Sequence, residues 1–497
     1  MNKMRKSGVL MPVASLPAKY GIGTFGEESY RFVDMLAEAG QTYWQILPLG
    51  PTSYGDSPYQ SFSTFAGNPY FIDIDILINE GLLTQKEAGA CDFGRKDDKV
   101  DYEKIYKSRF KLLKRAYERS ECDKDSGFKR FCSQNRFWLE DYALYMAIKD
   151  SLGGKSYLEW ELPIRKRVIK TLDMYRAKFA KEIDFYRFLQ YKFEQQWKNL
   201  KRYANKAGIK IIGDIPIYVA LDSADTWADP KLFRFDQDGF PTAVAGCPPD
   251  AFSATGQLWG NPLYNWEYHK KTGYKWWIRR IKRCTQLYDV VRVDHFRAFD
   301  AYYAIPYGDP TAEFGKWEKG PGFGLFTAIR EKLGDVDLIA EDLGYLTDSV
   351  RKLVKRTGYP GMKILQFAFD SREDSDYLPH NYEANSVVYT GTHDNDTTVG
   401  WFKVMKAADR KMALSYMNRK AFENDRDLAE SFIRLAMGSV SKTCIIPMQD
   451  WLALDGRARI NTPSTLGGNW EWRMKPQAFS HNLASRMRRI TRLYARL

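Results

Sequence analysis

The chain has 497 residues, of which 44% are hydrophobic and 28% charged, and its 75 Lys and Arg residues outnumber 62 Asp and Glu residues, giving a net charge of +13. This length and apolar content exclude a disulfide-stabilised mini-protein and a disordered chain, and they permit a large hydrophobic core. The positive charge makes nucleic acids and membranes partners to consider first.

The positive charge is concentrated in two segments. Residues 151–210 hold 15 Lys and Arg and 6 Asp and Glu, a net of +9, whereas residues 472–497 hold 7 Lys and Arg and no acidic residue, a net of +7. The rest of the chain therefore carries a net charge of −3. Both basic segments also have apolar residues at helical spacing, so we interpret them as solvated faces of amphipathic helices. We expect no nucleic-acid partner.

Cysteine usage and hydropathy indicate a cytoplasmic protein. Six cysteines are scattered through the chain with neither CxxC nor zinc-ligand spacing, which predicts reduced thiols rather than a disulfide framework. No apolar run approaches the ~20 residues of a membrane-spanning helix. Basic residues from Lys3 to Lys6 precede a short apolar stretch, but Pro12 interrupts it, so we favour a cytoplasmic protein over a secreted one.

Short apolar, β-branched runs recur along the chain and are typical of buried parallel strands, whose two faces are both covered. The predicted strands are Gly8–Leu16, Thr42–Leu49, Ile209–Val219, Asp289–Phe296, Leu338–Leu343, Met362–Phe369, Ser386–Thr392 and Lys442–Met448. Helical stripes lie between several of them; one begins at Tyr30 and ends at Gly40, and another begins at Val350 and ends near Gly358. The fold class predicted is α/β, a (β/α)8 TIM barrel.

The long gap between the second and third strands cannot be a simple loop. We predict a single catalytic barrel over residues 1–497, with a mainly helical insertion at 52–208 and a substrate-loop insertion at 220–285. Within the first insertion, helices are expected over Tyr102–Arg119, Arg136–Asp150 and Ile164–Ala204. The chain is expected to end in a docked helix from Leu483 to Leu497.

Acidic residues follow three of the predicted strands, at the end of the barrel where active sites lie. Asp294 ends the fourth strand, Glu341 follows the fifth, and Asp394 follows the seventh. Two carboxylates about 5 Å apart are what retaining glycoside chemistry needs. Arg292 shares a strand face with Asp294 and is expected to keep it ionised, whereas Glu341 needs a raised pKa to act as an acid. Taken singly, each acid could equally be a cap or a loop charge.

Loops rich in aromatic and short polar residues lie beside these strands. They are Tyr54–Ser61, Gly213–Tyr218, Ala251–Ser253 and Gln257–Asn261. A sugar presents apolar C–H faces and a rim of hydroxyl groups, and such loops can complement both. Each aromatic residue on its own could equally be core packing.

These motifs make the chain resemble the amylomaltases, the disproportionating enzymes or 4-α-glucanotransferases of the α-amylase clan. The resemblance runs from Ser15-Leu16-Pro17 to Gly468–Arg473 and includes Arg292–Arg297, Ala340–Gly344 and Gly391–Thr397. It implies a barrel with helical insertions and no C-terminal β-sandwich domain. One departure is Ser464, where the family pattern has Gly, and this touches the shape of a loop near the site.

The resemblance also implies roles for individual residues. Asp294 resembles the nucleophile, Glu341 the general acid/base, and Asp394 the third carboxylate, which binds sugar hydroxyls. The positions that match substrate-binding residues of the family are Tyr59, Ser57, Asp214, Trp259, Arg292, His393, Asn469, Phe367 and Tyr54. Within this set, Arg292 and His393 resemble orienting residues, and Tyr54 resembles an aromatic of an additional glucan site.

The activity implied is transfer of α-1,4-glucan segments between maltooligosaccharides, with neither a metal ion nor an organic cofactor. An α-1,4-glucan hydrolase of the same clan remains an alternative, because it shares the acids and differs in whether water reaches the intermediate. A non-catalytic glucan-binding barrel is a second alternative, which loss of any of the three acids would favour. No membrane partner is expected, and the oligomeric state is left open.

Overall fold

The computed structural model describes residues 5–53, 55–94, 96–249, 253–344 and 346–497. Eight strands form one parallel sheet in the order β10-β11-β12-β1-β2-β3-β6-β9. The strands are β1 (Lys6–Leu10), β2 (Tyr43–Gln45), β3 (Lys210–Pro216), β6 (Val290–Asp294), β9 (Leu338–Ala340), β10 (Gly361–Ile364), β11 (Ser386–Tyr389) and β12 (Thr443–Pro447). The two ends of this order meet, because the N–H of Ala340 donates to the carbonyl of Pro360 at 3.0 Å. The (β/α)8 barrel predicted from the sequence is confirmed, with one strand in each predicted segment.

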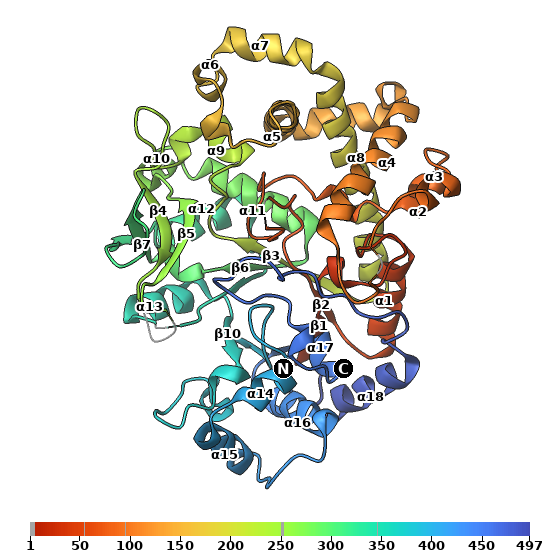
Figure 1. Cartoon of the computed structure of the whole chain (residues 1–497). Helices are drawn as coiled ribbons and strands as arrows, with labels where there is room; N and C mark the ends of the chain where they lie inside the picture. The colour runs from red at the N-terminus through yellow and green to blue at the C-terminus, as the bar shows by residue number, and fades with distance from the viewer. Residues whose placement is uncertain (1–4, 54, 95, 250–252, 345) are drawn as a thin grey trace.

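α-Helices follow most of the barrel strands and cover the outside of the sheet (Figure 1), whereas only short 3-10 helices lie between β10 and β11. The α-helices outside the long insertion are α1 (Glu27–Glu38), α9 (Ala224–Ala228), α10 (Trp266–Lys271), α11 (Lys275–Leu287), α12 (Phe323–Leu333), α13 (Asp348–Thr357), α14 (Thr398–Val404), α15 (Ala407–Tyr416), α16 (Asp425–Gly438), α17 (Met448–Trp451) and α18 (His481–Leu493). The α13 helix ends at Gly358, whose φ of +76° is the left-handed conformation that glycine adopts without a Cβ clash. This is the stop signal that the sequence predicted.

The segment between β2 and β3 is mainly helical, and its longer helices lie at the top of the view in Figure 1. It contains α2 (Ile74–Asn79), α3 (Gln85–Gly89), α4 (Tyr102–Arg119), α5 (Ser126–Ser151), α6 (Leu162–Arg165), α7 (Ile169–Lys178) and α8 (Ala180–Lys206). The α8 helix joins this segment to the barrel, since Phe193 and Trp197 pack against Phe25 with ring centroids 5.2 and 5.0 Å apart.

The expected helix over Ile164–Ala204 is instead three helices, α6, α7 and α8. The first break lies at Arg167, which has a left-handed φ of +56°. Its guanidinium pairs with Asp141 at 2.6 Å and covers the ring of Trp227 at 4.2 Å. These tertiary contacts outweigh the local helix propensity, which is a weak determinant by itself.

A second sheet, which was not predicted, stands beside the barrel. It is antiparallel, in the order β5-β4-β7-β8, and comprises β4 (Ala243–Cys247), β5 (Gln257–Pro262), β7 (Ala301–Pro306) and β8 (Lys316–Lys319). Half of it precedes β6 and half follows it, so it borders the end of the strand that carries Asp294.

Helix α18 and the residues that follow it dock through arginines as well as through an apolar stripe. Arg486, Arg488 and Arg496 donate to the carbonyls of Trp451, Glu38 and Met437 at 2.6, 3.1 and 2.8 Å. Each acceptor lies at the C-terminal end of another helix, α17, α1 and α16 respectively, where carbonyls lack intrahelical partners and cations are favoured. This accounts for much of the basic charge in the last segment.

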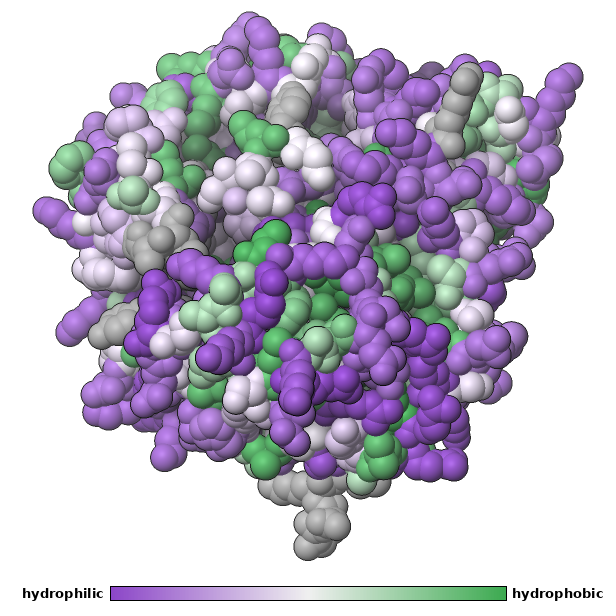
Figure 2. Space-filling view, turned by 60° about the horizontal axis from the view of Figure 1, so that its bottom comes forward, coloured by the Kyte–Doolittle hydropathy of each residue, from purple (hydrophilic) through white to green (hydrophobic). Residues whose placement is uncertain are grey.

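No helix in the described ranges combines the length and hydropathy needed to cross a membrane. On the face shown in Figure 2, hydrophilic residues predominate, and the hydrophobic ones form patches between them.

Candidate active site

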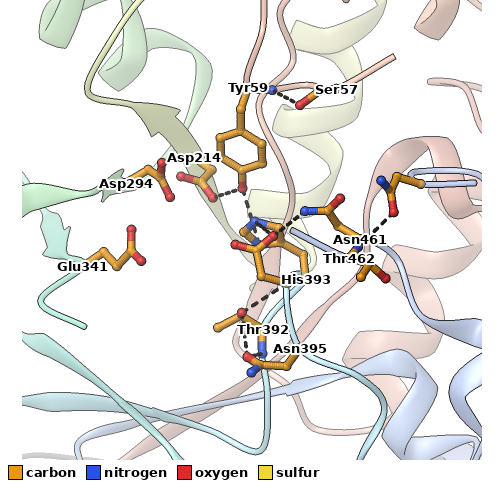
Figure 3. A network of polar contacts seen from close by, with 12 residues as sticks. Ser57, Tyr59, Asp214, Asp294, Glu341, Thr392, His393, Asn395, Asn461 and Thr462 are labelled. Atoms are coloured by element: carbon orange, nitrogen blue, oxygen red, sulfur yellow. Dashed lines mark hydrogen bonds and ion pairs between the residues drawn. The ribbon is translucent and has the colours of Figure 1, made fainter. Parts of the chain in front are cut away.

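The two central carboxylates lie at the ends of neighbouring strands. In the parallel register, Val293 of β6 pairs with Ala340 of β9, so Asp294 at the end of β6 lies beside Glu341, which directly follows β9. The Nη2 of Arg292 contacts Asp294 Oδ1 at 3.0 Å and Glu341 Oε2 at 3.1 Å. Figure 3 shows these two carboxylates next to each other. One buried guanidinium therefore holds both acids.

The same guanidinium also binds a third carboxylate, Asp214 of β3, through Nη1 at 2.5 Å. Asp214 is fully buried and accepts the hydroxyl of Tyr59 at 2.8 Å. The ring of Tyr59 stacks on His393 with centroids 4.9 Å apart and an interplanar angle of 15° (Figure 3). Burial, and then the charge of Asp214, raise the pKa of Tyr59, so its hydroxyl keeps its proton and remains a donor.

His295 positions Glu341 through its backbone. It follows Asp294 with a left-handed φ of +53°, and its N–H donates to Glu341 Oε2 at 2.6 Å. The ring of Trp259, on β5, meets the His295 ring edge to face at 4.7 Å and 88°. His295 was not among the predicted site residues. Its place directly after Asp294 was a signal, but a left-handed conformation at a non-glycine residue is too uncommon to predict.

The pKa values of the two acids shift in opposite directions. Burial, followed by the charge of Glu341, raises the pKa of Asp294 well above its ordinary value. Burial also acts to raise the pKa of Glu341, but Arg292, a hydrogen bond with Asp294 and the N–H of His295 together lower it. The sequence predicted the opposite order, because it placed Arg292 beside Asp294 alone. Each carboxyl group contacts the guanidinium, and only Glu341 gains the backbone donor.

Asp394 is the most accessible of the three predicted catalytic acids, with 43% of its side chain exposed. Its Oδ1 contacts His393 Nε2 at 3.3 Å and accepts Asn461 Nδ2 at 2.7 Å. Its Oδ2 has no hydrogen-bond partner within the described ranges. Asn461 comes from the loop after α17 and was not predicted, because nothing in the sequence links it to a residue 67 positions earlier.

Three further predicted residues, Phe367, Ser57 and Asn469, make contacts within their own loops or with a neighbouring ring. Phe367 is 41% exposed and packs edge to face on Tyr377. Ser57 accepts the N–H of Tyr59 at 3.3 Å and so supports the loop that carries it. Asn469 accepts a hydrogen bond from the N–H of Thr462 at 2.9 Å and closes its own loop.

Two predicted features fall partly or wholly outside the described residues. Tyr54 lies outside them, as do residues 251 and 252 of the predicted loop 251–253. In the Asn469 loop, Ser464 has a left-handed φ of +62°, a conformation in which glycine is unstrained. That conformation explains why glycine suits this position in the family pattern.

No group of three or more His, Cys, Asp or Glu side chains is arranged to hold a metal ion among the residues that the structure describes. The buried carboxylates converge on Arg292 instead. A guanidinium flanked by carboxylates at the ends of barrel strands can orient a nucleophile and an acid on either side of a glycosidic bond.

Comparisons with known proteins agree with this geometry. Residues 11–479 match the family model described as 4-alpha-glucanotransferase. A 4-alpha-glucanotransferase from Clostridium butyricum is 50% identical over 98% of this chain and 100% of its own length. The 4-alpha-glucanotransferase of Thermus thermophilus is 45% identical over 100% of both chains.

Solved structures give the same result. The amylomaltase from Streptococcus agalactiae, determined in complex with acarbose, has a TM-score of 0.95 at 44% identity and covers 99% of both chains. The amylomaltase from Corynebacterium glutamicum has a TM-score of 0.78 at 17% identity, over 98% of this chain and 75% of its own, which shows a shared fold.

Proposed function

Because the chain belongs to the 4-alpha-glucanotransferase family, we propose that Asp294, Glu341 and Asp394 carry its glucan transfer by a retaining double displacement. The observation that supports this assignment is the shared contact with Arg292. Asp294 Oδ1 and Glu341 Oε2 both touch one nitrogen, at 3.0 and 3.1 Å, and so lie at most about 6 Å apart. A retaining pair is separated by ~5–5.5 Å, whereas an inverting pair is separated by ~6.5–9.5 Å to admit a water molecule.

In the first step, the Asp294 carboxylate attacks the anomeric carbon of the donor. The glycosidic C–O bond breaks, and Glu341 gives its proton to the departing 4-oxygen. In the second step, the 4-hydroxyl of an acceptor gives its proton to Glu341 and attacks the same carbon, which releases the Asp294 carboxylate. Two inversions retain the α-linkage, and Glu341 ends each cycle protonated.

In the free enzyme the pKa of Asp294 is raised and that of Glu341 is lowered, which favours Asp294 as the holder of a proton shared by the two acids. The productive complex needs it on Glu341. The two groups are hydrogen-bonded to each other, so the proton moves a short distance when the donor binds. A glucosyl unit bound against Asp294 changes the environment of the two acids, and this change drives the transfer of the proton to Glu341.

Asp394 binds the donor rather than reacting with it. Its Oδ1 is held by His393 and Asn461, which leaves Oδ2 free to accept from sugar hydroxyls. Hydrogen bonds to the hydroxyls beside the cleaved bond strengthen as the ring distorts toward the transition state. The substrates proposed are α-1,4-glucans and maltooligosaccharides, acting as both donors and acceptors.

Maltotriose tests the balance between transfer and hydrolysis. Transfer is expected to yield glucose together with a ladder of longer oligosaccharides, which chromatography of the products resolves. Products that are only shorter than maltotriose would show that water outcompetes the acceptor and would support the hydrolase alternative.

The pH dependence of kcat/KM is expected to be bell-shaped with a broad plateau. At low pH, activity is lost when Glu341 and Asp294 are both protonated. The pKa of Glu341 lies below its ordinary value of 4.5, so kcat/KM is expected to fall only below pH 4.5. The single proton is lost only as pH rises through the raised pKa of Asp294, so the alkaline limb lies well above the ordinary range of an aspartate. Initial rates with maltotriose from about pH 3 to pH 10 measure both limbs. An alkaline limb near pH 4 to 5 would contradict this order, and unfolding temperatures at each pH provide the control.

Replacing Arg292 with lysine is expected to reduce kcat by ~10²–10³-fold with a smaller change in KM. Lysine keeps the charge, but a single ammonium cannot bridge Asp214, Asp294 and Glu341 as the planar guanidinium does. Arg234→Lys is a matched control, because Arg234 pairs with Glu318 at 2.6 Å on the second sheet. Equal loss in both variants would show a general effect of the substitution.

A further inference from the structure

A cavity of about 210 Å³ lies outside the barrel, between α12 and the segment that leads from α13 into β10. Its lining includes the rings of Phe323, Phe326 and Tyr359, with Arg330 and Glu331 among the polar residues. None of its lining residues belongs to the catalytic site described above. Its occupancy can therefore be changed without altering the reacting groups.

The cavity combines aromatic surface with a free hydroxyl group. Phe326 is 5% exposed and meets the Tyr359 ring at 5.8 Å, whereas Phe323 is partly covered by the Arg356 guanidinium at 4.0 Å. The Tyr359 hydroxyl has no hydrogen-bond partner in the described part of the chain. Rings flanked by hydrogen-bonding groups suit a ligand with an apolar face and hydroxyl groups at its edge.

The charges at the rim balance one another. Arg330 pairs with Asp335 at 3.0 Å, and Arg356 and Glu331 add one positive and one negative charge. A phosphate or another anion would need an excess of positive charge, which this rim does not offer. The balance favours an uncharged ligand that hydrogen-bonds to both donors and acceptors.

The volume limits the size of this ligand. It is smaller than the ~300–1,000 Å³ pockets that enclose drug-sized molecules, so it suits one small ring with its substituents. We propose that this cavity is an accessory binding site for one glucosyl unit of an α-glucan chain, separate from the catalytic centre. The proposal rests on the glucan-transferring function of the enzyme, because its substrate is a long neutral sugar chain that a second contact point can retain.

The choice of variants follows from the packing. Phe326 stacks on Phe296 at 5.1 Å and 25°, and the N–H of Phe296 donates to the Glu341 carbonyl at 3.1 Å, so changes at Phe326 would disturb the catalytic strand. Thr327 is exposed and lines the cavity, and Thr327→Trp fills it from the solvent side. Phe323→Ala removes part of its aromatic wall. Phe314→Ala is the matched control, an aromatic residue that is 73% exposed outside the cavity.

The test measures affinity for soluble amylose by retardation in native gels, with every variant also carrying Glu341→Gln to prevent turnover. Thr327→Trp and Phe323→Ala are each expected to weaken amylose affinity by at least about fivefold, and Phe314→Ala to leave it unchanged. In the active enzyme, Thr327→Trp is expected to keep kcat/KM for maltotriose within about twofold, since so short a substrate does not need the second contact.

Unchanged amylose affinity in both cavity variants would overturn the proposal, as would an equal loss in Phe314→Ala. These readouts are independent of the catalytic assignment, which fails separately if the parent enzyme does not disproportionate maltotriose. A crystal soaked with maltose supplies a direct measurement, in which the expected result is a glucosyl ring against Tyr359 and an empty cavity contradicts the site.

Discussion

Replacing Asp294 with asparagine is expected to reduce glucose release from maltotriose by at least ~10⁴-fold. The amide keeps the size of the side chain and an oxygen that can accept from Arg292, which lies 3.0 Å from Asp294 Oδ1. It lacks the carboxylate that forms a covalent bond with the anomeric carbon, so the first displacement has no nucleophile. Initial rates of glucose release, measured enzymatically over a wide range of enzyme concentration, give the size of the loss.

The same substitution is expected to maintain or raise the unfolding temperature at pH 7. The pKa of Asp294 is raised in the folded state, chiefly by burial, so the carboxyl group stabilises the fold only while protonated. That contribution is present below the ordinary pKa of an aspartate and is lost as pH rises through the raised value. A neutral amide avoids the loss. Inactivity together with a lower unfolding temperature would indicate damage to the fold and would contradict the assignment.

The barrel could be predicted because its strands carry a pattern with one physical cause. Runs such as Ser386–Tyr389 are buried on both faces and lack polar alternation. The second sheet shows this pattern only in part, because β4 and β7 are mostly buried whereas β5 and β8 are mostly exposed or half-buried. Its β8 strand, Lys316–Lys319, is largely exposed, and β4 includes Gly246, where a Cβ would lie 2.1 Å from the Gln257 carbonyl. Its strands are held by pairing across distant segments, which the sequence does not display.

Residues that the sequence places at the ends of neighbouring strands lie together in the structure, whereas the contacts made by loop residues could not be predicted. Asp294 and Glu341 adjoin because β6 and β9 are neighbours in register. The contribution of Asn461 to Asp394 depends on a loop conformation, and that of His295 to Glu341 depends on a left-handed φ. The pKa shifts of Asp294 and Glu341 run opposite to the prediction for the same reason. The sequence does not show which of the two carboxylates accepts the extra backbone N–H.

The buried ion cluster also explains why a basic chain has an acidic active site. Arg292 is 2% exposed and is surrounded by three carboxylates, so the site is negatively charged even when one proton is shared. In the basic insertion, Lys192 and Lys201 pair with Glu80 and Asp289 at 2.8 and 3.5 Å. Part of the basic surface of the insertion therefore has acidic partners within the protein, and a neutral glucan needs none of the remaining positive charge.

Replacing Glu341 with glutamine is expected to reduce maltotriose disproportionation by ~10²–10⁴-fold, the range for loss of a positioned proton donor. A donor whose leaving group needs no proton, such as α-maltosyl fluoride, is expected to release fluoride in the first step at a rate much closer to that of the parent enzyme. The second step still lacks its base, so the glycosyl-enzyme is expected to accumulate. Mass spectrometry of the quenched protein is then expected to show a maltosyl adduct on the peptide that contains Asp294.

Azide separates the role of Glu341 from any structural effect of the substitution. Azide is a nucleophile that needs no deprotonation, so it is expected to release the maltosyl adduct as α-maltosyl azide. Azide is therefore expected to restore turnover of α-maltosyl fluoride in Glu341→Gln. It is not expected to do so in Asp294→Asn, where no adduct forms. Asp342→Asn is the matched control, because Asp342 is the next residue and accepts the Met362 N–H at 2.7 Å. It is expected to lower stability without any response to azide. A β-configured azide product, or rescue of Asp294→Asn alone, would reverse the assignment of nucleophile and acid.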